Sequence, residues 1–547
     1  MSILQRMLFL AACSVLLAGC GIESISSDDQ NPSSKPNLLT TVTGQLTYQD
    51  RLYNSQGFIS EEKPLKAIRN VPVELRDAND LLIAQTSADD QGRFSMPDVP
   101  EGNYLLRVIA ETEHSSGTKV TIRSASGQRY AIEQEVFVSP TENTLTFNAT
   151  TNDRIAGIFN MLDVMTLGLD FVDALALNHS TVDDLTVYWQ WGRFEGTYTC
   201  HFTSSYCTQG AGIYVLSDPL VTHDTDEFDD DVLWHEFAHH LEFSWGMLDS
   251  PGGAHSLISR SLDMRLSWSE GMASAFSLSL KKWLRSVAPD RLSIANDMGE
   301  DYSSYYIDTI GTSAQISVDL LNASSAFYRN VTNEAAVASG ILRLQNITGI
   351  YTTWQQLFNT LTENSTADTM DAFWDGMVAG LQPSSALLEQ WQWTLAAKHI
   401  DYQQDAYESD DSVYSALQLS LDEEQSHTLY RTVYSVDEDW YQLLLTAGQS
   451  YRIETFNLIN GADTELKLYA YDGAHFTLIA SNDDAEDCGV CVPLHDGKNF
   501  ASVVNYTPSD SAIYYVSVRN ADAVYTDPIS YGYLGRYGGY SIRYQQQ

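Results

Sequence analysis

The pattern of apolar and polar residues divides the chain into three regions. From Val42 to Thr150, apolar and polar residues alternate in short runs, which is typical of β-strands that bury one face. The runs that show this alternation are VTGQLTY, VPVELRD, LLIAQTS, NYLLRVIA and TLTFNAT. Turn residues separate the runs at 89–92 (DDQG) and 100–103 (PEGN). We therefore predict a β-sandwich over residues 41–150.

The C-terminal region, residues 424–547, shows the same alternation. It contains runs such as DWYQLLL and GGYSIRYQQQ, with Gly and Asp at the turns and many Tyr residues between them. This texture predicts a second antiparallel β-sandwich.

The middle region, residues 151–405, has a different periodicity. The stretch RIAGIFNMLDVMTLGLDFVDALAL has apolar residues at helical spacing, and mostly helical segments follow later. Two strand candidates lie between them, at 185–192 and 212–218. The second, GIYVLSD, has the pattern of either a buried strand or an edge strand that pairs with an extended peptide. With 547 residues, the chain is expected to be a multidomain α+β protein, with a mainly helical domain between two antiparallel β-sandwiches.

The N-terminus has the pattern of an export signal. One Arg, an apolar run from Met7 to Leu17 and the ending Leu-Ala-Gly-Cys predict a cleaved signal peptide over residues 1–19. The ending resembles the bacterial lipoprotein signal, which implies lipidation of Cys20, with Gly21 favouring the outer membrane, on its periplasmic or cell-surface face. Residues 20–40 are polar and rich in Ser and Pro, so they are expected to form a flexible tether. We expect the lipid anchor to be the membrane contact.

The charge of the chain disfavours one class of binding partner. There are 30 Lys and Arg residues against 72 Asp and Glu residues, and such an acidic surface repels nucleic acid. Beyond the signal, the Cys residues form two close pairs, Cys200 with Cys207 and Cys488 with Cys491. In an oxidising compartment, two short-loop disulfides are expected.

A metal-binding motif lies in the middle region. His235-Glu236-x-x-His239 places two His residues one helical turn apart on one face, so that both imidazoles can reach one ion. Glu236 lies beside them, where it can take a proton from a zinc-activated water. A catalytic zinc takes a third protein ligand. A His six residues after His239 is excluded because position 245 is Trp, and His255 lies in a Gly-rich loop.

The stronger candidate for the third ligand is Glu270 in LSWSEGMASA. It opens a helical segment, and Gly271 is expected to let that segment pack closely against the His-bearing helix. The arrangement resembles the gluzincin class of zinc metallopeptidases, which implies His235, His239 and Glu270 as zinc ligands and Glu236 as general base. In gluzincins an Asp four residues after the Glu ligand orients a His. Ser274 stands there in this chain, so another group must support the His, and Asp263 is the candidate.

Residues 224–275 also resemble a group of bacterial lipoproteins with the motif His-Glu-Trp-Gly-His followed later by Asp-Pro-Arg and Glu-Gly. This chain has Phe237-Ala238 and Met264 at the differing positions. The flanking regions carry resemblances of their own. Residues 89–104 are similar to the carboxypeptidase-regulatory-like domain, which implies a spacer or binding module. DEDWY, GADTELKLY and SNDD resemble the pre-peptidase C-terminal domain of secreted bacterial proteases, and these acids are candidates for a structural Ca²⁺.

Two further features bear on the site. The acids of HDTDEFDDD, at 224, 226, 227 and 229–231, fit either capping of the following helix or a Ca²⁺ loop. An oxyanion-stabilising group remains open among Tyr302, Tyr305 and Tyr306, with His255 and His399 behind them.

These patterns predict a membrane-anchored, exported zinc metallopeptidase that acts on a peptide or protein substrate. The alternative is a non-catalytic, adhesin-like surface protein that keeps a metallopeptidase fold while its sandwiches bind a polymer or a partner.

Overall fold

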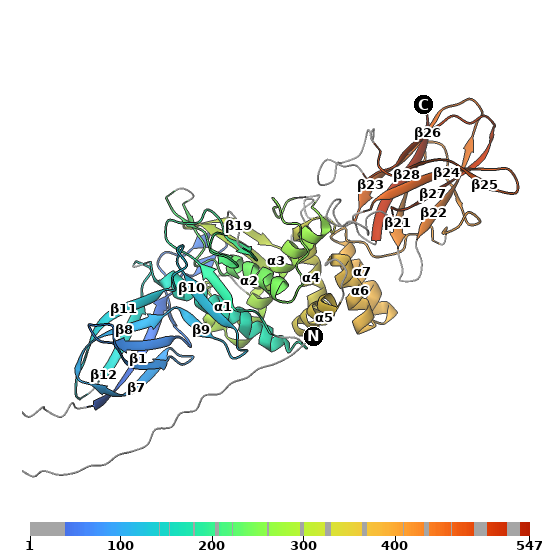
Figure 1. Cartoon of the computed structure of the whole chain (residues 1–547). Helices are drawn as coiled ribbons and strands as arrows, with labels where there is room; N and C mark the ends of the chain where they lie inside the picture. The colour runs from blue at the N-terminus through green and yellow to red at the C-terminus, as the bar shows by residue number, and fades with distance from the viewer. Residues whose placement is uncertain are drawn as a thin grey trace, which may run out of the picture.

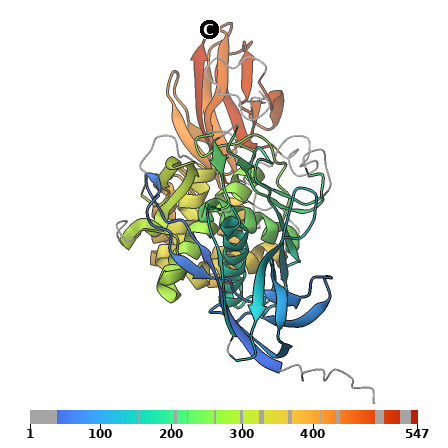
Figure 2. The same ribbon diagram turned by 90° about the vertical axis from the view of Figure 1, so that its left-hand side faces the viewer.

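The computed structural model describes residues 39–547 except 142, 153, 179–180, 203–206, 221–222, 260–261, 296–299, 323–329, 364–368, 409, 431–436, 461, 486–499 and 522–536. The predicted signal peptide, the lipidation at Cys20 and the pairing of Cys488 with Cys491 lie outside the described residues. An N-terminal β-rich part, a helical middle part and a C-terminal β-rich part follow one another along the molecule (Figures 1 and 2). The chain is thus of mixed α and β structure, with sandwich-like ends.

The N-terminal part contains two four-stranded sheets. The first has the order β12-β1-β4, with β7 also paired to β1: β1 Leu39–Gln49, β4 Leu65–Ala67, β7 Arg93–Pro100 and β12 Asn143–Ala149. The second has the order β11-β8-β5-β6: β5 Pro72–Arg76, β6 Leu82–Ser87, β8 Gly102–Ile109 and β11 Ala131–Val138. Strand β1 buries every second residue, as the alternation of its sequence predicts. The pairing differs from a purely antiparallel sandwich in one place, because β1 and β12 run parallel.

A five-stranded sheet joins this part to the middle of the chain. Its order is β14-β15-β13-β10-β9, with β9 Glu111–Glu113, β10 Lys119–Arg123, β13 Leu185–Tyr188, β14 Tyr198–Cys200 and β15 Gly212–Tyr214. Strands β9 and β10 precede residue 150, where a domain boundary was predicted, yet they belong to one sheet with strands that follow it. One hydrophobic core accordingly runs from Val42 to Tyr402.

The sheet also decides between the two interpretations of residues 212–218. Strand β15 pairs with β13 on one side and with β14 on the other, and its three residues are buried. The edge strands of the sheet are β14 and β9 instead.

The helices of the middle part are α1 Ala156–Leu175, α2 Asp230–Ser244, α3 Met264–Val287, α4 Glu334–Thr348, α5 Ile350–Glu363, α6 Met370–Leu381 and α7 Ser385–Ala396. Helix α1 can approach α2 closely because Gly168 faces the ring of Phe237, where a Cβ would lie 2.7 Å from a ring carbon. Short 3-10 helices span Pro289–Arg291 and Glu300–Ser304. Among the described residues, none of the helices combines the length and the apolar character needed to cross a lipid bilayer.

Three small hairpins complete the middle part. They are β2 Tyr53–Asn54 with β3 Gly57–Phe58, β16 Ser217–Asp218 with β17 Asp224–Thr225, and β18 Tyr305–Ile310 with β19 Ser313–Asp319. The hairpin of β18 and β19 lies in a region where the sequence pattern predicted mostly helices.

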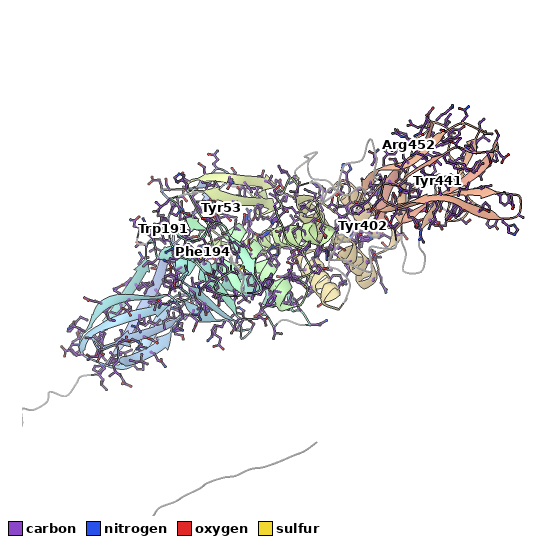
Figure 3. The ribbon with its side chains drawn as sticks, turned by 45° about the horizontal axis from the view of Figure 1, so that its top comes forward. Tyr53, Trp191, Phe194, Tyr402, Tyr441 and Arg452 are labelled. Carbon is purple, nitrogen blue, oxygen red and sulfur yellow. A yellow bond between two sulfur atoms is a disulfide. The ribbon has the colours of Figure 1, made fainter. Side chains whose placement is uncertain are left out.

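The C-terminal part has a core of its own, from Leu419 to Tyr544. One sheet has the order β20-β22-β27-β24-β25: β20 Leu417–Gln418, β22 Glu438–Leu445, β24 Thr464–Tyr471, β25 Phe476–Asn482 and β27 Ala512–Asn520. The other has the order β21-β28-β23-β26: β21 Gln425–Tyr430, β23 Tyr451–Ile459, β26 Val503–Tyr506 and β28 Tyr537–Gln546. The hydroxyls of Tyr441 on β22 and Tyr540 on β28 lie 2.5 Å apart and link the two sheets. Tyr441 lies inside this sandwich, whereas Tyr402 lies next to the helices (Figure 3).

Candidate metal centre

Helix α2 presents the two His residues of the motif on one face. Trp234, Phe237, Ala238 and Leu241 are fully buried, which fixes how the helix is rotated in the core. The Nε2 atoms of His235 and His239 lie 3.2 Å apart. The spacing of four residues thus brings the two imidazoles together, as expected for a helix.

Glu270 on α3 completes a group of three ligand atoms. Its Oε2 atom lies 3.1 Å from Nε2 of His235 and 3.4 Å from Nε2 of His239. The three side chains are mostly buried, and their ligand atoms lie within reach of a single metal ion. The group comes from two helices that pack against each other.

The spacing of these atoms fits a zinc ion. Two ligands at ~2.0–2.1 Å from a tetrahedral zinc lie about 3.3–3.4 Å from each other. The three separations here, from 3.1 to 3.4 Å, are close to that value. Two imidazole nitrogens and one carboxylate oxygen are also a donor set that zinc accepts at catalytic sites.

The charges of the group are complementary even without an ion. Burial acts to raise the pKa of Glu270, but the adjacent His239 and hydrogen bonds from both His residues lower that pKa well below its ordinary value. Burial acts to lower the pKa of His239, whereas Glu270 and Glu242 raise it well above the ordinary value. The carboxylate thus remains ionised, as a metal ligand must.

The outer nitrogens of both His residues have partners. Nδ1 of His239 donates to Oε2 of Glu242 at 2.8 Å, and the hydroxyl of Ser269 also donates to that oxygen, at 2.7 Å. Nδ1 of His235 lies 3.2 Å from the hydroxyl of Ser274. Such contacts fix the orientation of each ring and leave Nε2 directed at the metal position.

Glu242 is therefore the acid that contacts His239, whereas Asp263, the residue suggested for such a role, pairs with Arg265. Asp263 caps the start of α3 by accepting from the backbone N–H of Arg265 at 2.9 Å, and it forms an ion pair with the guanidinium of the same residue. Glu242 lies three residues after His239 on α2, so it reaches the ring from the same helix face.

Gly271 permits a close approach, but to a different helix from the one expected. A Cβ at this position would lie 2.6 Å from the backbone O of Glu334 and 2.7 Å from the side chain of Val337. Both residues belong to α4. The glycine next to Glu270 therefore brings α3 against α4, and not against α2.

Glu236 is buried and held by strand β14. The hydroxyl of Thr199 donates to Oε2 of Glu236 at 2.7 Å and lies 2.9 Å from its backbone O. The next residue, Cys200, forms a disulfide with Cys207, which confirms that predicted pair. No sequence motif indicated the contact of Thr199 with Glu236, because Thr199 comes from a strand 37 residues before Glu236.

His255 lies at the outer side of Glu270. Its Nε2 atom is 3.4 Å from Oε1 of Glu270, and its Nδ1 atom is 2.9 Å from Oε2 of Glu334. The hydrogen bond with Glu334 raises the pKa of His255. The side chain keeps 34% of its surface exposed, more than the three ligand candidates do. The Gly-rich loop therefore does bring this His to the site.

The tyrosines of β18 separate into two groups. The ring of Tyr306 lies 6.1 Å from that of His235, measured between centroids, whereas Tyr305 stacks on Tyr302 at 4.8 Å. Adjacent residues of a strand point to opposite faces, which explains the difference. Tyr306 is thus the tyrosine of this strand that borders the candidate metal ligands. His240 points elsewhere: it is buried, and its Nε2 lies 3.0 Å from the backbone O of Asp183.

The acids at the start of α2 do not cap the helix. Asp229 occupies the N-cap position, but its side chain makes no capping hydrogen bond. It accepts instead from the backbone N–H of Thr309 at 3.0 Å, and Asp231 accepts from that of Ile307 at 3.0 Å. These carboxylates fasten strand β18 to the start of α2, in place of the capping that the sequence suggested.

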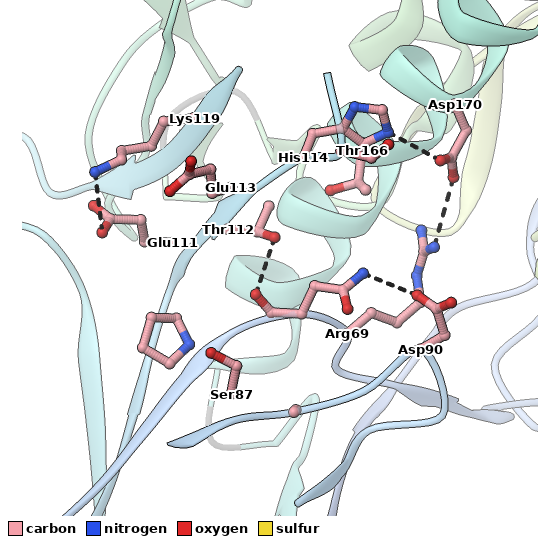
Figure 4. Close-up of a pocket in the computed structure, with 14 residues that line it drawn as sticks. Arg69, Ser87, Asp90, Glu111, Thr112, Glu113, His114, Lys119, Thr166 and Asp170 are labelled. Atoms are coloured by element: carbon pink, nitrogen blue, oxygen red, sulfur yellow. Dashed lines mark hydrogen bonds and ion pairs between the residues drawn. The ribbon is translucent and has the colours of Figure 1, made fainter. Parts of the chain in front are cut away.

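A separate polar cavity of about 600 Å³ lies between the N-terminal strands and α1 (Figure 4). Several of its charged groups pair with one another. Asp170 contacts His114 at 3.1 Å and Arg69 at 3.6 Å, and Lys119 lies 3.9 Å from Glu111.

Comparisons with known proteins find limited structural similarity. No protein-family model matches the sequence, and no curated protein matches it either. Among solved structures, the pre-peptidase C-terminal domain of a collagenase from Bacillus anthracis matches 24% of this chain and 93% of its own length, at 15% identity and a TM-score of 0.15. A surface-associated copper-binding protein of Methylomicrobium album BG8 matches 24% of this chain and 98% of its own, at 12% identity and a TM-score of 0.18. A periplasmic inhibitor of g-type lysozyme from Aeromonas hydrophila matches 24% of this chain and 97% of its own, at 16% identity and a TM-score of 0.14. The likeness to a pre-peptidase C-terminal domain is therefore weak and partial.

Proposed function

We propose that this chain is a zinc metallopeptidase of the gluzincin type, in which His235, His239 and Glu270 hold the metal and Glu236 is the general base. The observation that carries the proposal is the convergence of three ligand atoms, each 3.1–3.4 Å from the other two. The carboxylate of Glu242 behind His239 adds to it, since ligating His residues commonly donate to such a group.

A zinc ion bound there would act as a Lewis acid on a carbonyl and would lower the pKa of water. Glu236 would take the proton of the attacking water and pass it to the leaving amine. The hydroxyl of Thr199 donates to Oε2 of Glu236, which holds the carboxylate in one orientation and leaves Oε1 to exchange the proton.

We assign to His255 the role of stabilising the oxyanion that develops during peptide hydrolysis. It is more exposed than the three ligand candidates, and its Nε2 atom faces Glu270. Its contact with Glu334 favours the charged form of the ring, and a charged donor stabilises an oxyanion more strongly than a neutral one. Tyr306 is buried beside His235 and is assigned a packing role in the same wall.

The substrate in this proposal is an extended peptide. Strand β14 is at the edge of the five-stranded sheet, and its Thr199 contacts the general base. A peptide that adds to a sheet edge aligns its backbone along that strand. Pairing along β14 would therefore bring a peptide carbonyl next to Glu236.

The location of the enzyme belongs to the proposal as well. The leader and Cys20 support an exported lipoprotein of the outer membrane, held at a distance by the tether of residues 20–40. The two flanking sandwiches would serve as spacer or binding modules, as the resemblance to regulatory-like and pre-peptidase domains implies.

The test is the replacement of Glu236 by Gln, which keeps the shape of the side chain and removes the base. The variant is expected to bind zinc as the wild type does and to lose at least ~100-fold in kcat on a mixture of unfolded protein substrates. Full peptide hydrolysis by Glu236→Gln would overturn the mechanism. Zinc binding without hydrolysis in the wild type would favour the alternative, a non-catalytic surface protein.

A further inference from the structure

A second group of acidic side chains lies near the metal ligands but does not belong to them. Asp224 and Asp226, at and just after β17, and Asp308 on β18 each direct one carboxylate oxygen to a common point, where the three oxygens lie within 4.8 Å of one another. Asp224 is 6% exposed and Asp226 is 5% exposed. Two separate hairpins thus supply a compact group of carboxylates, of which two are buried and that of Asp308 is partly exposed.

Two oxygens of this group lack a partner. Oδ1 of Asp224 and Oδ1 of Asp226 are both buried and accept no hydrogen bond. The other oxygen of Asp226 accepts from the hydroxyl of Thr197, which itself accepts from the backbone N–H of Leu216 at 2.8 Å. Buried carboxylate oxygens that remain unpaired are costly, because they have lost water without a replacement.

Two further acidic residues border the group. Glu227 and Asp229 lie beside it and are also buried. Among the described residues, no Lys or Arg forms an ion pair within 4.0 Å with any of its three members. Burial and the neighbouring acids raise the pKa of Asp226 well above its ordinary value, and burial with Asp224 raises that of Asp308 to about 6. Within the part of the chain that the structure describes, no cationic side chain is therefore paired with the group.

The chemistry of the donors selects the class of cation. All of them are oxygens, and hard cations such as Ca²⁺ prefer carboxylate and hydroxyl oxygens, whereas zinc sites use nitrogen or sulfur. Opposite ligands of Ca²⁺ lie ~4.6–5.2 Å apart, so a spread within 4.8 Å fits inside one Ca²⁺ coordination sphere. Mg²⁺ places opposite ligands only ~4.0–4.2 Å apart and demands stricter geometry.

We propose that Asp224, Asp226 and Asp308 form a calcium site that fastens hairpin β18–β19 to hairpin β16–β17 beside the start of α2. The site is separate from the candidate zinc centre and does not depend on the proposed peptidase activity. Its link to that centre is mechanical, since Tyr306, two residues before Asp308, packs against His235.

The experiment measures Ca²⁺ binding to the full mature chain after all metals have been removed. Ca²⁺ is titrated with Mg²⁺ as the comparison, and two signals are followed: the melting temperature, and Tb³⁺ luminescence, which the nearby Tyr306 can sensitise. We expect the melting temperature to rise with the concentration of Ca²⁺, and to rise much less with Mg²⁺, because only the folded state holds the site. No Ca²⁺-dependent rise in the wild type would overturn the proposal.

Variants locate the site. Asp226→Asn with Asp308→Asn should abolish the Ca²⁺-dependent rise, and without Ca²⁺ this double variant should melt at or above the temperature of the wild type, since the repulsion is removed. If the double variant fails to fold, Asp308→Asn alone should weaken Ca²⁺ binding at least ~10-fold. The matched control is Asp483→Asn with Asp484→Asn, in the acidic group around Asp463 of the C-terminal sandwich. Loss of the effect in this control, with its retention in the Asp226 and Asp308 variants, would contradict the proposal.

Discussion

The Nδ1 atom of His239 lies 2.8 Å from Oε2 of Glu242, one turn further along the same helix. Replacing Glu242 by Gln keeps a hydrogen-bond acceptor but removes a negative charge. That charge holds the imidazole ring of His239 in place and increases its basicity. We expect zinc affinity to fall about 10–100-fold, as is typical when such a partner is lost. Competition with a chromophoric chelator measures the change.

The matched control is Asp263→Asn, the acid that the sequence suggested for the same role. It removes an ion pair with Arg265 at the start of α3, so it is expected to lower stability while leaving zinc affinity within a few-fold of the wild type. If Asp263→Asn lowered zinc affinity more than Glu242→Gln did, Glu242 would not be the acid that supports His239.

The ion pair of Lys281 with Asp231 is the buried link between α3 and the start of α2. Nζ of Lys281 lies 2.5 Å from Asp231, the two side chains are 0% and 1% exposed, and Nζ also donates to the backbone O of Tyr305 at 2.8 Å. Lys281→Met leaves the carboxylate buried without its cation, which should lower the free energy of unfolding by about 3–5 kcal/mol. Urea unfolding measures this loss. Lys281→Met combined with Asp231→Asn should lose less, and an equal or larger loss would show that the pair itself is not the cause.

The contact at Gly271 should be sensitive to a single methyl group. Gly271→Ala places a Cβ against the backbone of Glu334, which cannot move as a side chain can, so we expect a loss of about 1–3 kcal/mol in the free energy of unfolding. Gly246→Ala offers a contrast, because Gly246 has open space around it but a positive φ of 69°. Its cost should come from backbone strain, of about 1 kcal/mol, and should leave zinc affinity unchanged. If Gly271→Ala were neutral, α3 and α4 would not be packed as closely as described.

The pH dependence of stability should be visible through Asp230. This residue is 2% exposed, and burial together with Asp50 raises its pKa to about 7, against the opposing effect of Lys66. The unfolded carboxyl titrates near 4, so the folded state binds the proton more tightly, and the free energy of unfolding falls as the pH rises from about 4 to about 7. In the Asp230→Asn variant, the fall of the melting temperature between about pH 5 and about pH 8 should be smaller than in the wild type. An unchanged slope would show that Asp230 does not contribute.

The sequence predicted those features that depend only on residues close together in the chain. The four-residue spacing of His235 and His239 brings their rings together on one helix, and the alternation in VTGQLTY matches the buried positions of β1. The hairpin over Tyr305–Asp319 carried a signal that could have found it: two short runs with polar alternation on either side of Gly311 and Thr312.

The other features of the fold and the site depend on contacts between segments that are far apart in the sequence. Sequence periodicity does not predict such contacts. Thr199 reaches Glu236 only because the sheet places β14 beside α2, and β10 leaves the N-terminal sandwich to pair with β13. Gly271 shows the same limit, since a small residue predicts a close approach but not which helix approaches. The acids at the start of α2 were expected either to cap the helix or to form a Ca²⁺ loop, yet tertiary packing buries Asp229 and Asp231 against β18.

The most direct test of the account is the zinc content of the lipid-free mature chain, measured for the wild type and for Glu270→Ala after reconstitution and removal of free metal. The account predicts one zinc per wild-type chain and loss of that zinc in the variant. A wild-type chain that binds no zinc, or a variant that retains it fully, would contradict the assignment of His235, His239 and Glu270 as the metal centre.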